Sequence, residues 1–119
     1  MQRFARPIAW FVAAFWAGSG LWAFFAPQSF FDSLATFPPY NVHLIHDIGA
    51  FTIGLGAVIA FALVGMSALR SALLGVGVGS VFHVASHVID YDQNPDPVDV
   101  AGLAVVAALT LAAAFAFDR

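Results

Sequence analysis

The chain has 119 residues, of which 61% are hydrophobic and only 9% are charged, and it contains no Lys, Glu or Cys. An ordinary soluble domain carries roughly 25% charged residues, and a small domain needs a polar surface because so much of it is exposed. The net charge of −3, without a basic patch, also excludes a nucleic-acid-binding protein. The sequence therefore predicts a single integral membrane domain whose partner is the lipid bilayer.

Four apolar stretches have the length of about 20 residues that a helix needs to cross a bilayer. They cover residues 7–26, 42–64, 69–89 and 97–117. Pro7 suits a first helical turn, Asn41 is a good N-cap for the second stretch, and Asp96 followed by Pro97 marks the start of the fourth. The prediction is an all-α bundle of four transmembrane helices in up-down order.

The connections between the spans differ in kind. Residues 65–67 form a tight turn, so the second and third spans are expected to pair as a helical hairpin. Residues 28–40 mix aromatic with polar side chains, which predicts a short interfacial helix followed by a turn at Pro38 and Pro39.

Arginine gives the orientation. With four spans, both termini and the turn at 65–67 share one side of the membrane, and every Arg falls on that side: Arg3, Arg6, Arg70 and Arg119. The positive-inside rule then predicts a multi-pass protein of the cell membrane with cytoplasmic N- and C-termini.

All four His lie in two short strings, at the start of the second span and at the end of the third. Residues three and four apart share a helix face, and small residues such as Gly54 and Gly79 predict a close approach of these two helices. We therefore expect imidazoles and carboxylates from both spans to meet in one outer cleft. The candidate site residues are His43, His46, Asp47, His83, His87 and Asp90.

Ionisable groups are costly inside a membrane and usually have partners there. A transition metal, namely copper, zinc or iron, would satisfy this set of imidazoles and carboxylates. The chain has no Glu, which disfavours a ferritin-like di-iron centre. Three alternatives stay open: haem held by one His from each helix, a proton-sensing His group, and side chains that are simply solvated or paired at the headgroup level.

Residues 39–51 (PYNVHLIHDIGAF) and 82–87 (FHVASH) resemble a group of small four-helix membrane proteins of actinobacteria that have no assigned activity. The resemblance covers most of the chain and implies the four-span architecture. It makes His43, Asp47, His83 and His87 the motif positions, while other residues are usual at the position of His46.

Two functions follow as expectations. The first is a membrane metal-binding protein which, if it is an enzyme, oxidises a lipid-soluble substrate. The second is a non-catalytic accessory subunit of a larger membrane complex, in which the His and Asp residues are structural. The expected partners are such a complex or further copies of this chain, and a homo-oligomer would not favour the accessory subunit. The sequence does not decide between a catalytic and a non-catalytic protein.

Overall fold

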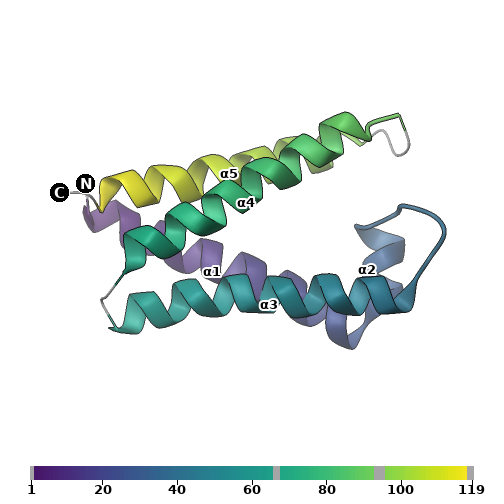
Figure 1. The fold of residues 1–119 in the computed structure, drawn as a ribbon, viewed down its shortest axis with the longest axis horizontal. Coiled ribbons are helices and arrows are strands. Elements are labelled where there is room, and N and C mark those ends of the chain that lie inside the picture. The colour runs from purple at the N-terminus through teal and green to yellow at the C-terminus, as the bar shows by residue number, and fades with distance from the viewer. Residues whose placement is uncertain (1, 66–67, 93–95, 118–119) are drawn as a thin grey trace.

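The computed structural model describes residues 2–65, 68–92 and 96–117, and within them the chain is helical with short connections. Four of its helices are long and apolar enough to cross a membrane, which confirms the all-α fold of four candidate spans. The fifth is a short helix between the first two of these (Figure 1). The helices are α1 (Gln2–Phe25), α2 (Pro27–Ser33), α3 (Val42–Gly65), α4 (Leu69–Ile89) and α5 (Pro97–Ala116).

The predicted helix starts are confirmed except for the first. Asn41 accepts a hydrogen bond from the Leu44 N–H, and Asp96 accepts from the N–H groups of Val98 and Asp99, so both act as N-caps. Helix α1, however, begins at Gln2 and contains Pro7. Pro7 is the sixth residue of this helix, and the helix continues through it although proline has no N–H to donate to the preceding turn. Of the predicted turn at 65–67, Gly65 is the last residue of α3, and residues 66–67 lie outside the described residues.

Helices α1 and α3 form the closest pair in the bundle. A Cβ on Gly56 would lie 2.5 Å from the Ala17 amide nitrogen, and a Cβ on Gly20 would lie 2.8 Å from the Gly49 carbonyl oxygen. The two backbones therefore touch directly, which glycine permits and which is a common way to pack helices in membranes.

Helix α4 packs against α5 and makes only slight contact with α3. The expectation that small residues draw the second and third spans together is wrong, because a Cβ on Gly54 or Gly79 would meet nothing within 4 Å. The α4 glycine at a close helix contact is Gly77, which lies against Leu111 of α5. The molecule therefore consists of two helix pairs, α1 with α3 and α4 with α5, joined mainly by contacts between α1 and α5.

The two pairs lie close together at the end that holds the termini and diverge toward the end that holds α2 (Figure 1). We call the α2 end the open end. The main apolar core includes Trp16, Ile59, Leu73 and Val106 and so draws on all four long helices. A second, smaller core of Ala23, Phe30 and Ile45 fixes α2 at the open end.

Candidate ligand cavity at the open end of the bundle

The two His of α4 continue the stripe of that helix that faces the core. Val76 and Ser80 are buried on α4, and His83 and His87 follow at the spacing of three and four residues that keeps side chains on one face. Because the helix pairs diverge here, the stripe emerges from the core into a cavity. The two imidazole rings lie next to each other, with 5.1 Å between their centroids.

Asp99 of α5 faces the same cavity. It lies seven residues before the buried Val106, and thus on the face of α5 that packs into the bundle. Its backbone N–H is held by the carboxylate of Asp96 at 3.2 Å, so the start of α5 is well fixed. Asp99 and the two His of α4 give this cavity its polar groups.

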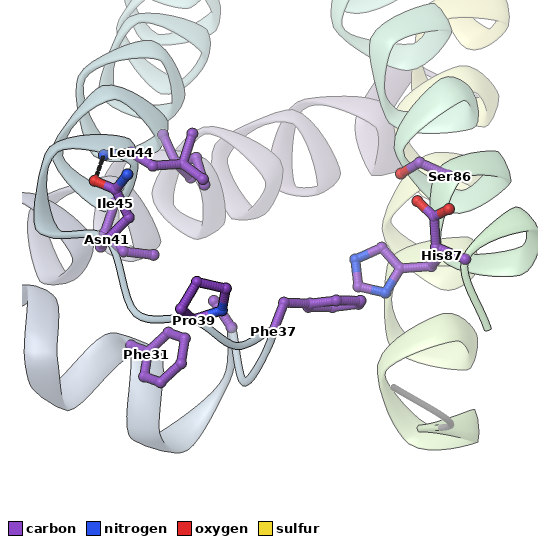
Figure 2. A pocket seen from close by; sticks show the side chains of 11 residues that line it. Phe31, Phe37, Pro39, Asn41, Leu44, Ile45, Ser86 and His87 are labelled. Atoms are coloured by element: carbon purple, nitrogen blue, oxygen red, sulfur yellow. Dashed lines mark hydrogen bonds between the residues drawn. The ribbon is translucent and has the colours of Figure 1, made fainter. Parts of the chain in front are cut away.

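Two adjoining cavities occupy the open end, of about 480 Å³ and about 430 Å³. The first, which we call the α3-side cavity, includes Phe31, Pro39, Leu44, Ile45, Ser86 and Asp90 in its lining (Figure 2). The second, the α5-side cavity, includes Phe15, Phe30, Leu34, His83, Asp99 and Leu103. Both are lined by Ala35, Phe37, Ile48 and His87. Each is mainly apolar with a few polar groups, as ligand sites commonly are.

Phe37 is one of the residues that line both cavities. It lies on the segment between α2 and α3, and Figure 2 shows its ring reaching across to His87 on α4. The Phe37 and His87 rings are 5.6 Å apart between centroids and nearly perpendicular, at 85°, which is a favourable edge-to-face geometry for two aromatic rings. This contact links the α2 segment to the α4–α5 pair.

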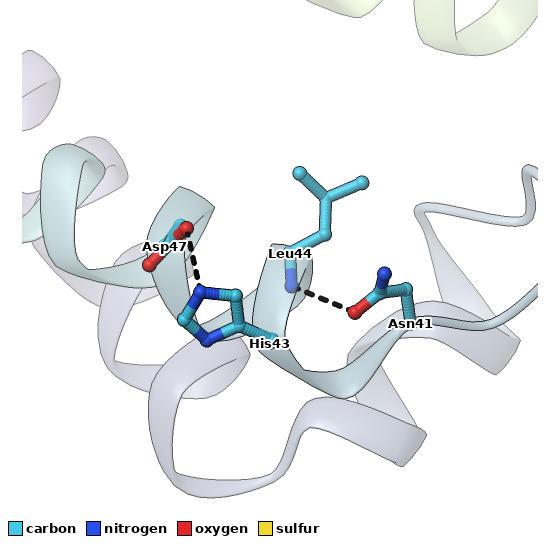
Figure 3. Close-up of polar contacts among 4 residues, drawn as sticks. All are labelled: Asn41, His43, Leu44 and Asp47. Carbon is cyan, nitrogen blue, oxygen red and sulfur yellow. Dashed lines mark hydrogen bonds and ion pairs between the residues drawn. The ribbon is translucent and has the colours of Figure 1, made fainter.

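The α3 residues of the predicted site lie elsewhere. His43 pairs with Asp47 on the outer surface of α3, with 3.5 Å between Nε2 and Oδ2 (Figure 3), and the His43 side chain is 85% exposed. Ile45 and Gly49 are the buried positions of this turn. Two residues along a helix turn the side chain by about 200°, so packing on α1 through Ile45 and Gly49 directs His43 and Asp47 outward.

His46 neither lines the cavities nor belongs to the pair of His43 and Asp47, but lies against α1. Its ring lies 5.3 Å from the ring of Phe24, on α1, measured between centroids. The structure thus places His46 against α1, whereas His83 and His87 line the cavity.

The six predicted site residues therefore do not meet in one cleft. Among residues 2–65, 68–92 and 96–117, no group of three or more His or Asp side chains is arranged to hold a metal ion. The physical reason is the pairing of α3 with α1, which separates its polar residues from those of α4. What the structure does bring together is His83 and His87, with Asp90 bordering the α3-side cavity.

Several cavity residues were not among the predicted site residues. Asp99 is one of them, although its spacing of seven from the buried Val106 marks the inner face of α5. Phe37 and Ala35 had no sequence pattern that would single them out. Trp16 is buried beside His83, with 6.0 Å between ring centroids. Tertiary packing alone brings these two residues of different helices together.

No family model matches the chain, and no curated protein or solved structure is significantly similar to it. The resemblance to small actinobacterial membrane proteins thus stays a prediction.

Proposed function

We propose that this integral membrane protein binds a lipid-soluble small molecule in the cavities at its open end. The observation that supports the proposal is the combination of an apolar lining with the imidazoles of His83 and His87 in that lining. Apolar walls with a few convergent polar groups are the usual features of a small-molecule site. Each cavity has a volume within the range of known ligand pockets.

The slight contact between α3 and α4 supports the same proposal. The open end is formed where these neighbouring spans diverge, so a molecule dissolved in the bilayer reaches the cavities sideways between them. The surrounding surface carries exposed apolar side chains, such as Phe51 and Phe82, which suit contact with lipid.

Ala35 offers a sharp test, because it lines both cavities. We expect purified protein in lipid nanodiscs to retain 1-naphthol after dialysis in a saturable manner, above empty nanodiscs. Ala35→Phe fills the space and should reduce this retention at least tenfold. Ala101→Phe, at an exposed position of α5 outside both linings, should retain the wild-type amount. Equal retention by the two variants, or none above empty nanodiscs in the wild type, would refute the proposal.

A transition metal and oxidation of the ligand remain proposals from the sequence. The residues that would contribute are His83 and His87, since two imidazoles on one helix face are good ligands for copper, zinc or iron. Two protein ligands are fewer than the three or more of ordinary metal sites, so the remainder would come from the bound molecule or water. Metal analysis of purified wild-type protein and His87→Ala tests this: a stoichiometric metal lost in the variant supports it, and its absence from the wild type refutes it.

The orientation in the cell membrane is likewise proposed from arginine. Arg6 lies on α1 near the N-terminus and Arg70 in the first turn of α4, both at the end that holds the termini. With that end cytoplasmic, the cavities lie toward the outer leaflet.

A further inference from the structure

The indole N–H of Trp16 is a buried donor in the main core. Trp16 is only 4% exposed, and its indole Nε1 has no hydrogen-bond partner among the residues that the structure describes. Buried polar groups in native proteins are nearly always paired, so each exception calls for an explanation. An acceptor that arrives with a ligand is one such explanation.

The position of Trp16 supports an acceptor that arrives with a ligand. The Trp16 ring contacts Phe15 at 5.1 Å and His83 at 6.0 Å between centroids, and both neighbours line the α5-side cavity. Trp16 itself belongs to the main core. Its indole therefore lies directly behind the cavity wall, with the His83 imidazole between it and the space where a ligand would bind.

His83 can connect the Trp16 indole with a ligand in the cavity through hydrogen bonds. A neutral imidazole has one nitrogen that donates a hydrogen bond and one that accepts. In the structure the His83 and Trp16 rings are inclined to each other by 33°, and Trp16 Nε1 makes no hydrogen bond to His83. If the imidazole turns so that one nitrogen accepts from the Trp16 N–H, the other nitrogen must carry the proton. His83 then presents a donor to the cavity.

We infer, on the basis of the proposed function, that the ligand is a neutral, flat ring bearing a carbonyl oxygen, of the quinone class, and that Trp16 determines this specificity through His83. The carbonyl accepts from His83, which completes the hydrogen bonding of Trp16. The aromatic side chains of Phe15, Phe30 and Phe37 offer faces and edges for a flat ring. The carboxylate of Asp99 in the same lining disfavours an anionic ligand.

Two probes of nearly the same shape test the inference: menadione, which has two carbonyl groups, and 2-methylnaphthalene, which has none. In nanodiscs containing ¹⁵N-labelled protein, menadione should shift the indole N–H resonance of Trp16 downfield, as expected for a new hydrogen bond, whereas 2-methylnaphthalene should not. Trp16→Phe identifies the resonance. It should also weaken menadione binding about fivefold, which is the usual contribution of one neutral hydrogen bond, and leave 2-methylnaphthalene binding unchanged.

The matched control is Trp10→Phe, since Trp10 is on the same helix and 45% exposed; it should bind both probes as the wild type does. His83→Phe keeps a ring but removes both nitrogens, and should weaken menadione binding as much as Trp16→Phe does, with no further loss in the double variant.

If both probes bind equally and Trp16→Phe affects neither, the inference is wrong while the cavity proposal stands. If neither probe binds, the proposed function fails with it.

Discussion

The close contact between α1 and α3 predicts that one added methyl group at Gly56 destabilises the protein. An alanine Cβ there would lie 2.5 Å from the Ala17 amide nitrogen and 2.6 Å from the Ala13 carbonyl oxygen. Atoms in favourable contact lie about 3.5–4.0 Å apart, so α1 would have to move away by about 1 Å. Both obstacles are backbone atoms, which means that no side-chain rotation relieves the clash.

The magnitude follows from two opposing terms. Overpacking of this kind costs about 1–3 kcal/mol, and the rigid backbone on the far side favours the upper part of that range. Replacing glycine by alanine within a helix gains about 1 kcal/mol. We therefore expect Gly56→Ala to lower the free energy of unfolding by about 1–2 kcal/mol.

Gly54 is the matched control. It is exposed on the same helix, two residues away, and a Cβ there would meet nothing within 4 Å. Gly54→Ala should therefore be neutral or stabilising. The assay is unfolding by sodium dodecyl sulfate in mixed micelles, followed by tryptophan fluorescence, to which the buried Trp16 contributes. If Gly56→Ala is as stable as Gly54→Ala, the direct backbone contact between α1 and α3 is refuted.

Two further predictions concern the α5 cap and the orientation. Asp96→Ala removes the acceptor of the Val98 and Asp99 N–H groups and should cost about 1 kcal/mol of stability, measured by the same unfolding assay; the exposed Asp92→Ala should cost less than half as much, and equal losses would contradict the cap. For orientation, the natural chain has no cysteine, so Ser33→Cys at the open end and Ser71→Cys at the other end report separately. An impermeant maleimide added to intact cells should label only Ser33→Cys, and the reverse pattern would contradict cytoplasmic termini.

The membrane fold followed from local features of the sequence. Length and hydrophobicity place four spans, and the caps at Asn41 and Asp96 fix where two of them start. These features depend only on neighbouring residues and on the bilayer thickness. The start of α1 was predicted too late, because Pro7 favours a first turn without requiring one.

The rotation of each helix could not be predicted in the same way. The spans are apolar around most of their circumference, so no polar face in the sequence indicates which side turns inward. The sequence correctly indicated that glycines pack helices together, but the predicted pair of helices, α3 with α4, is wrong. A Cβ on Gly54 or Gly79 would meet nothing within 4 Å, whereas Gly49 and Gly56 contact α1. That choice depends on the shape of the partner helix, which is not a local property.

The sequence by itself therefore determined that this chain is a membrane protein of four apolar spans with its His residues near one end. Tertiary structure alone decided that His83 and His87 face a shared cavity while His43 and Asp47 face outward. The physical reason is that direct backbone contact selects one rotation of α3 against α1. A turn of that helix by about 100°, the angle between successive residues, would have presented a different set of side chains to the cavity.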